Sequence, residues 1–494
     1  MKYKSTIAVL SFSLVLFFIS PMITSCKKAD LKILSPKDSI STNQTFLFIT
    51  RSGDKLMNGN NEFRFIGMDT PNLTVVEDNE WGVQGWHRVT EYEISDAFKT
   101  ILQMGGTVTR TYTLSIQGGA SNTNNESHIH RIGNYDEAMF KDLDLVLKLA
   151  NEYKIRLIIP FIDNWDWWGG TKEFAGFSGK TQAEFCTDST VISNYKLLIS
   201  YVLNRINTYT GIKYKDDPAI LAWETGNELG PENSNGDVTL LDKWTNEIAT
   251  YIKSIDKNHL VADGKDCFRY GISDAQLNDS NIDMITDHYY WGDYVAACQA
   301  ARNLCKGKKV FYVGEFNSTD PTVNNNLLST VISNGTSGAL LWSLRFHANN
   351  GGFYYHGDAT DSSNPCFRWP GFSSNSLTSE TTKMEQIRLY AYEINNLNEP
   401  KLSVPDTPYL IPASQPNQIR WQGSVGAQYY VLERSTSTSG PWVTINNHAT
   451  EDAIPYSPYV DGSAVAGASY FYRITACNSI GVSPVSNVIG PISF

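Results

Sequence analysis

The stretch that decides the fold is ILAWETGNELG at residues 220–230. An apolar run leads into the pair Asn227-Glu228 and stops at Gly230. A parallel strand that is covered on both faces has such an apolar run, and at the mouth of a barrel it ends in polar residues. The stretch VFYVGEFN at 310–317 repeats the pattern and carries Glu315 near its end. Two such strands predict two carboxylates that face one another across a pocket.

The length and composition limit the possible number of domains and the kinds of binding partner. A chain of 494 residues is long enough for more than one domain. Its 41% hydrophobic and 18% charged residues are ordinary for a soluble globular protein. The net charge of -11 argues against nucleic acid as a partner, because a polyanion would be repelled. A neutral substrate fits this charge better.

The first residues resemble a bacterial lipoprotein signal. Two lysines precede a mostly apolar run at 7–19, and the sequence ITSC ends at Cys26. In such signals the cysteine is lipidated and becomes the first mature residue. We therefore expect a signal peptide at 1–25, a lipid anchor on Cys26 and a polar tether at 26–45. The protein would be exported and anchored to a bacterial membrane, the outer membrane, facing the periplasm or the surface. An ordinary signal peptide and a short membrane anchor are the alternatives.

Strand-like and helix-like patterns alternate through the next 350 or so residues. The strand-like runs lie at 63–69, 107–114, 155–164, 220–228, 260–264, 284–290, 310–317 and 339–345. Helical patterns lie at 92–104, 137–153, 191–209, 240–255, 324–334 and 381–397. This alternation predicts an α/β fold, a (β/α)8 TIM barrel over residues 46–400, with a small hairpin near its start that plugs the bottom. An open doubly wound sheet is the alternative, but no Gly-rich phosphate loop follows a strand.

The pattern changes after a Pro-containing linker at 399–406. Short alternating strands follow at 418–422, 429–434, 442–446 and 470–476, separated by turn residues. They predict a small all-β immunoglobulin-like sandwich over 401–494. The stretches SGPW at 439–442, YRITACN at 472–478 and GVS at 481–483 resemble a fibronectin type III domain. Such domains serve as spacers or binding modules, so this fold alone assigns no function.

The predicted barrel strands end in side chains that can do chemistry, and these ends all point to one face of a barrel. They are Asp69, Arg110, Asn164, Glu228, His288, Tyr290, Glu315 and Trp342. Cleavage of a glycosidic bond needs one carboxylic acid to protonate the leaving oxygen and one carboxylate at the anomeric carbon. Glu228 fits the acid, with an apolar neighbourhood that raises its pKa, and Glu315 fits the nucleophile. The alternative is that each glutamate is a solvated strand terminus.

Several stretches are similar to glycoside hydrolase family 5, and most of all to its endo-β-1,4-mannanase subfamily (subfamily 7-like). They are RINTYTG at 205–211, YKDDPAI at 214–220, the pairs Trp223-Glu224 and Asn227-Glu228, and Asn164-Trp165 followed by Gly169-Gly170. The resemblance covers roughly residues 46–397. It implies a retaining hydrolase of β-linked hexose polysaccharides or oligosaccharides, β-1,4-mannan above all, that needs no metal and no organic cofactor.

The resemblance also implies roles for single residues. Glu228 matches the acid/base and Glu315 the nucleophile. Asn227 matches the residue that binds the sugar 2-hydroxyl, and Trp342 the platform beneath the sugar. The remaining candidates for substrate binding or support of the nucleophile are Arg110, Asn164, Trp165, His288 and Tyr290. Glu224, on the same strand face as Glu228, is expected to be a structural ion-pair partner.

Two departures from the family leave the substrate open. Leu229-Gly230 follows the catalytic pair where the subfamily commonly has Pro-Arg, and Asp266-Cys267-Phe268 replaces Glu-Gly-Phe. A β-glucanase or an exo-β-mannosidase on the same fold is therefore an alternative. An alternative of another class is a non-catalytic surface lipoprotein that binds glycan. We further considered a disulfide between Cys298 and Cys305 across a short loop, and a surface position for His128 and His130, where a metal site is the weaker interpretation.

Overall fold

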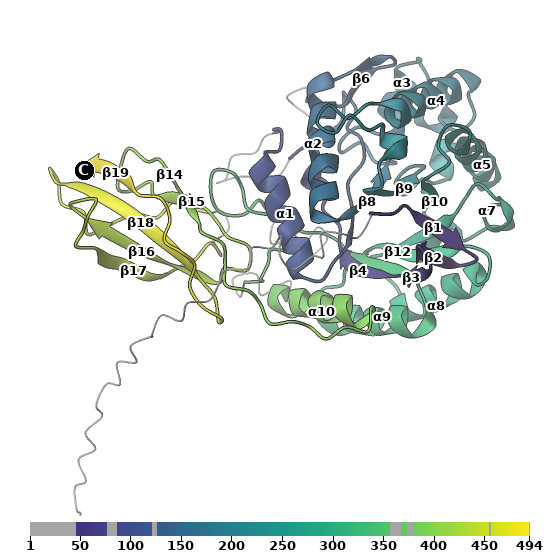
Figure 1. The fold of residues 1–494 in the computed structure, drawn as a ribbon. Helices are drawn as coiled ribbons and strands as arrows, with labels where there is room; N and C mark the ends of the chain where they lie inside the picture. Colours follow the sequence, from purple (N-terminus) through teal and green to yellow (C-terminus); the bar gives the residue numbers. More distant parts are fainter. Residues whose placement is uncertain are drawn as a thin grey trace, which may run out of the picture. The chain divides into compact units, whose positions relative to one another are not determined.

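Eight parallel strands form the central sheet of the protein, in the order β4-β13-β12-β11-β10-β9-β8-β5 (Figure 1). The computed structural model describes residues 46–76, 86–120, 126–355, 367–372, 379–453 and 456–493. The strands are β4 Phe65–Met68, β5 Val108–Arg110, β8 Arg156–Pro160, β9 Ile220–Glu224, β10 Leu260–Asp263, β11 Met284–Tyr289, β12 Val310–Phe316 and β13 Gly338–Leu341. Thr70 N donates to Arg110 O at 3.0 Å between the two end strands, so the barrel is nearly closed. The predicted barrel is confirmed.

Helices follow the strands and cover the barrel from outside. They are α1 Glu91–Gln103, α2 Glu137–Tyr153, α3 Thr171–Gly176, α4 Ser189–Asn204, α5 Val238–Ile255, α6 Cys267–Tyr270, α7 Asp274–Asn278, α8 Tyr294–Cys305, α9 Pro321–Asn334 and α10 Glu380–Glu393. Side-chain caps fix several starts. Thr90 and Glu93 form a capping box at α1, and Asp136 accepts from two backbone amides at α2.

Cys298 and Cys305 both lie on helix α8, whereas the disulfide considered between them needs a short loop. The two thiols lie seven positions apart on one helix, about 10 Å along its axis, which is too far for a disulfide. Both are buried and free. They serve as small apolar side chains of the core.

The small sheet β1-β2-β3 precedes the barrel and packs into it. Its strands are β1 Ile49–Ser52, β2 Lys55–Asn58 and β3 Asn61–Phe63. Ile49 and Leu56 belong to the same buried cluster as Leu221, Met284 and other side chains of the barrel strands. The strands β1 to β3 therefore fill one end of the barrel, as expected of a plug.

The C-terminal region is all-β. Strands β14 Tyr409–Ile411 and β15 Arg420–Gln422 pair with each other, and β17 Val443–Ala449, β16 Tyr429–Ser435, β18 Ser469–Cys477 and β19 Ile489–Ser493 form a four-stranded antiparallel sheet. Trp421, Tyr430 and Tyr472 are central to its core. Residues 46–494 cluster as one compact unit. The boundary near residue 400 stays a prediction.

The predicted signal peptide, Cys26 and the tether at 26–45 lie outside the described residues. Within the described ranges, no helix has both the length and the apolar composition that a membrane span requires.

Candidate active site

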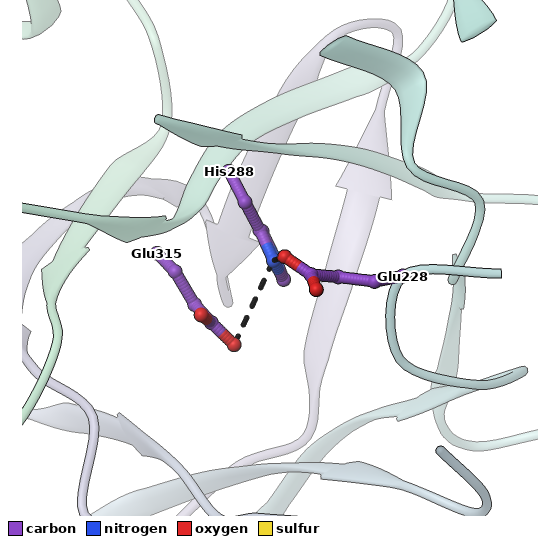
Figure 2. A group of neighbouring side chains, drawn as sticks. All are labelled: Glu228, His288 and Glu315. Atoms are coloured by element: carbon purple, nitrogen blue, oxygen red, sulfur yellow. Dashed lines mark hydrogen bonds and ion pairs between the residues drawn. The ribbon is translucent and has the colours of Figure 1, made fainter. Parts of the chain in front are cut away.

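Glu228, His288 and Glu315 converge at the carboxyl ends of three barrel strands (Figure 2). Glu228 lies four residues beyond β9 and has φ +51°, in the left-handed region that few side chains adopt. Backbone bonds on both sides hold this conformation, from Asn227 N to Ile162 O at 2.7 Å and from Leu229 N to Gly264 O at 2.8 Å. Such strain persists only where the surroundings determine it, so the backbone aims this carboxylate.

Glu315 is held by two donors from other strands. Arg110 Nη1 donates to Oε1 at 2.7 Å, and Tyr290 Oη donates to Oε2 at 2.5 Å. Glu315 is 4% exposed and Arg110 is fully buried. Hydrogen bonds to both oxygens fix the orientation of the carboxylate.

Arg110 is the centre of a buried network. Its Nε and Nη2 donate to the two oxygens of Glu224, each at 2.8 Å, and Nη2 also donates to Asn227 Oδ1 at 2.7 Å. Burial by itself lowers the pKa of Arg110, but the charges of Glu224 and Glu315 outweigh it and place the pKa well above its ordinary value. Glu224 is thus a structural partner of the arginine, as expected.

His288 and Trp165 hold Glu228. His288 Nδ1 lies 2.8 Å from Oε1, and Trp165 Nε1 donates to Oε2 at 2.6 Å. Burial by itself raises the pKa of Glu228, but these bonds and the charge of His288 outweigh it, so the pKa lies below its ordinary value. The sequence predicted a raised pKa for this acid, and in the free protein that prediction is wrong.

The lowered pKa of Glu228 and the raised pKa of His288 place the proton of this pair on His288. Burial by itself lowers the pKa of His288, but the nearby charges of Glu315 and Glu228 raise it to about 9. His288 Nδ1 also lies 3.6 Å from Glu315 Oε1. At neutral pH the site therefore holds a protonated His288 beside an ionised Glu228, and the charge of Arg110 is shared between Glu315 and Glu224.

Asn227 and Asn164 have different surroundings. Asn227 donates to Asp163 Oδ1 at 2.9 Å and lines the cavity of the site. Asn164 instead donates to Glu232 at 2.8 Å and accepts from Asn233 at 2.6 Å. Asn164 is not among the residues that line the cavity, so it links loops beside the site.

The cavity in front of the carboxylates measures about 510 Å³. Six predicted residues are on its wall: Trp165, Asn227, Glu228, Tyr290, Glu315 and Trp342. Six others on this wall were missed: Tyr112, Arg269, Trp291, Asn317, Ser318 and Thr319. Trp291 directly follows Tyr290 and is 49% exposed, and the Arg269 guanidinium lies 5.0 Å over its ring. The predicted residues Arg110 and His288 are not among the residues of this wall. They contact Glu315 and Glu228, which are.

Of the three tryptophans in the loop after β8, Trp165 is 44% exposed and faces the cavity, while Trp168 is buried. The Trp165 indole thus combines a hydrogen bond to Glu228 with an exposed face. Trp342 follows β13 and lies 5.8 Å from the ring of Tyr112. These indoles form two aromatic faces on the cavity, the kind of surface on which sugar rings stack.

Two places in the described structure contain a histidine of the kind that can bind a metal ion. Within the described part of the chain, Glu228, His288 and Glu315 bring one ligand atom each within 4.8 Å of one another. Their bonds to one another and to Arg110 account for this geometry without an ion. His128 is fully buried, with Nδ1 2.8 Å from Ser115 Oγ, and burial lowers its pKa to about 3. The expected surface position of His128 is therefore wrong.

Comparison with known proteins gives a family match and a fold match. The profile described as "GH family 5 beta-mannosidase-like" matches residues 48–302. The chain is 33% identical over 218 residues to the putative mannan endo-1,4-beta-mannosidase 4 of Arabidopsis thaliana, covering 42% of this chain and 50% of that protein. It is 37% identical over 205 residues to mannan endo-1,4-beta-mannosidase 1 of Oryza sativa subsp. japonica, covering 40% and 46%. The chain thus spans about half the length of these curated relatives.

Among solved structures, the endo-1,4-beta-mannanase from Rhizomucor miehei superposes with a TM-score of 0.54 at 23% identity, covering 69% of this chain and 99% of that one. The endo-beta-1,4-mannanase from Thermotoga petrophila gives 0.56 at 20% identity, covering 88% and 99%. At these identities the likeness establishes the fold alone.

Proposed function

This chain belongs to the beta-mannosidase-like group of glycoside hydrolase family 5, and we propose that it hydrolyses β-linked mannan with retention of anomeric configuration. The observation that carries the proposal is the spacing of the two carboxylates. Glu228 and Glu315 each have one carboxylate oxygen within 4.8 Å of the other, and both line one cavity. Retaining glycosidases hold their carboxyl groups about 5 Å apart, whereas inverting ones leave room for a water at about 6.5–9.5 Å.

In the first step Glu315 attacks the anomeric carbon. Arg110 and Tyr290 hold its two oxygens, so the nucleophile reaches the carbon without reorientation. The leaving oxygen takes a proton from Glu228. In the free protein that proton is on His288, whose Nδ1 lies 2.8 Å from Glu228 Oε1, and it passes along this bond to Glu228 once the substrate fills the cavity.

In the second step water cleaves the ester between the sugar and Glu315. Esterification removes the negative charge of Glu315, one of the two charges that raise the pKa of His288. Glu228, now without its proton, takes one from the attacking water and passes it back to His288, which restores the starting state. The released sugar keeps its β configuration, and Glu315 returns to its ionised state.

The choice of mannan is supported by the family and by the mannan endo-1,4-beta-mannosidases among the relatives. Trp165 and Trp342 offer aromatic faces for sugar rings, and Asn227 offers an amide at the cavity wall. A β-glucanase or an exo-β-mannosidase would use the same carboxylates and is the second candidate. A glycan-binding lipoprotein without activity is the candidate of another class.

The test is a panel of mannan, glucomannan, galactomannan, xylan and β-glucans, with the products sized over time. We expect mannan to give oligosaccharides of several lengths from the earliest samples. Mannose alone from the start supports an exo-β-mannosidase, and products from β-glucan alone support a β-glucanase. Tight binding in calorimetry with no reducing ends released would overturn the enzymatic proposal.

We further propose that the chain is a lipoprotein with a fibronectin type III-like C-terminal domain at 401–494. The motif that ends at Cys26 supports the first assignment, and the alternating core positions of β16 and β18 support the second. Metabolic labelling with palmitate tests the anchor. The wild type should take up label in a bacterial host, and Cys26→Ser should not.

A further inference from the structure

The C-terminal sheets contact the segment that directly follows Trp342. This segment, residues 343–353, follows β13 and turns back on itself, with a bridge between His347 and Phe353 and a bond from Ala348 N to Gly352 O at 2.8 Å. Its first residues are fixed by the barrel, since Leu344 N donates to Asp69 O at 2.8 Å. Its tip has a second set of partners.

Those partners come from the C-terminal region. Gln422 Nε2 donates to Asn349 Oδ1 at 2.9 Å and to Asn349 O at 3.2 Å. Two glycines allow the backbones to approach closely. A Cβ at Gly351 would lie 2.9 Å from the Trp421 carbonyl, and one at Gly352 would lie 2.3 Å from the Tyr456 ring. The tip of the segment therefore fits against β15 and the strand-connecting chain near Tyr456.

His347 is the centre of this contact. It is 2% exposed, and its Nδ1 lies 2.9 Å from Asp96 of α1, while Nε2 lies 3.4 Å from Glu451 of the C-terminal region. Burial by itself lowers the pKa of His347, but Asp96 and Glu451 raise it to about 10. A buried cation between two carboxylates is costly to break, since removing one partner leaves an uncompensated charge.

We propose that the C-terminal region is a positioning element of the active site, which holds segment 343–353 and thereby sets the position of Trp342. Trp342 lies five residues before His347 and has one face on the substrate cavity. The chain between them is bonded to its neighbours, by Leu344 N to Asp69 O at 2.8 Å and by Arg345 N to Phe367 O at 2.8 Å, so a displacement at His347 reaches Trp342 through a short, bonded piece of chain. A C-terminal domain that only binds polysaccharide would have no such effect on the cavity.

Gly423→Ala is the sharpest perturbation, because it leaves the barrel sequence unchanged. An added Cβ would lie 2.3 Å from His347 Cδ2 and 2.8 Å from Glu451 Oε2, so the imidazole must move. Gly423 has no positive φ, so the methyl acts by contact alone. Gly462→Ala is the matched control, since its Cβ would meet nothing within 4 Å. Glu451→Gln keeps the shape of its side chain and serves if Gly423→Ala fails to fold.

The experiment measures kcat and KM of the full chain on soluble mannopentaose and on mannan, together with hydrogen exchange of peptides that cover 342–353. In Gly423→Ala we expect faster exchange in these peptides and a loss of roughly 5- to 50-fold in kcat/KM on both substrates. Gly462→Ala should match the wild type in both readouts.

Two outcomes overturn the inference. The first is faster exchange at 342–353 with kcat/KM on mannopentaose unchanged, which would show that the contact does not act on the cavity. The second is a loss confined to mannan, which would make the C-terminal region a binding module. The inference rests on the proposed function only for the measurement of kcat and KM, because hydrogen exchange needs no substrate. A wild type inactive on every glycan would refute the function, while unchanged exchange in Gly423→Ala would refute the contact.

Discussion

Replacing His288 with glutamine is expected to move the alkaline limb of the pH–rate profile to lower pH. Burial by itself lowers the pKa of His288, but Glu315 and Glu228 raise it to about 9, so the pair His288–Glu228 keeps its proton up to about that pH. Above it no proton remains for the leaving oxygen. Because kcat/KM reports the titration of the free enzyme, its alkaline limb belongs to this pair.

The expected size of the change in the pH–rate profile follows from the raised pKa of His288. A histidine pKa that rises from 6.5 to about 9 corresponds to roughly 3 kcal/mol of interaction with its charged neighbours. Without His288, Glu228 keeps the bond from Trp165 but must hold the proton itself. A carboxyl group in this position loses its proton well below pH 9, so we expect the limb to move down by at least about 1 pH unit.

The same shift sets the sign of the stability change. The folded pKa of His288 lies above the unfolded value, so its contribution is present in full below about pH 6.5 and is lost as the pH rises through about 9. The wild type should therefore lose up to roughly 3 kcal/mol of unfolding free energy relative to His288→Gln across that range. Urea unfolding at pH 6 and pH 9.5 measures it. An alkaline limb at the same pH in both proteins would refute the assignment of the proton.

Three further predictions concern the neighbours of the carboxylates. Tyr290→Phe removes a 2.5 Å bond to Glu315 and should lower kcat/KM about 10- to 150-fold, as expected for a bond to a charged group, with little change in melting temperature. Glu224→Ala removes the partner that binds two nitrogens of the buried Arg110, which then keeps only Glu315 as an ion-pair partner, and should destabilise the protein by about 3–5 kcal/mol, measured by urea unfolding; a loss below about 1 kcal/mol would contradict the ion-pair account. Trp165→Phe keeps an aromatic face but removes the donor to Glu228, so its activity should fall with a shifted pH profile, and an unchanged profile would count against the role of that bond.

Much of the barrel could be predicted from sequence because its strands are short apolar runs with polar ends. Both faces of each strand are covered, so the runs are almost uninterrupted, as at 220–224 and 310–313. Helix α8 was harder to foresee. Its Cys298 and Cys305 act as buried apolar residues, whereas in the sequence they are also candidates for a disulfide.

The positions of Glu228, Glu315, Arg110 and Tyr290 could be predicted for one physical reason. The carboxyl ends of parallel strands meet at one face, so polar residues at these ends lie together whatever their separation in sequence. Side chains on loops lack this constraint. Asn164 sits at a strand end but bonds to Glu232 on a loop 68 residues away, which no local pattern foretells.

The protonation of the site depended on contacts that the sequence does not encode locally. Trp223 and Leu229 flank Glu228 in sequence and favour a raised pKa, but the decisive partners are His288, 60 residues away, and Trp165, 63 residues away. Arg269 and Trp291 were missed for a similar reason. Arg269 follows β10 and Trp291 follows β11. The two come together where the guanidinium of Arg269 lies over the indole of Trp291.

The central claim is that Glu315 is the nucleophile and Glu228 the acid/base of a retaining hydrolase. Proton NMR of a manno-oligosaccharide digest, recorded within the first minutes, tests it most directly, with Glu315→Gln as the inactive control. We expect the β-anomer of the new reducing end to appear first and only later to equilibrate with the α-anomer. If the α-anomer appeared first, Glu315 could not be the nucleophile, because inversion needs a water where the structure places Glu315.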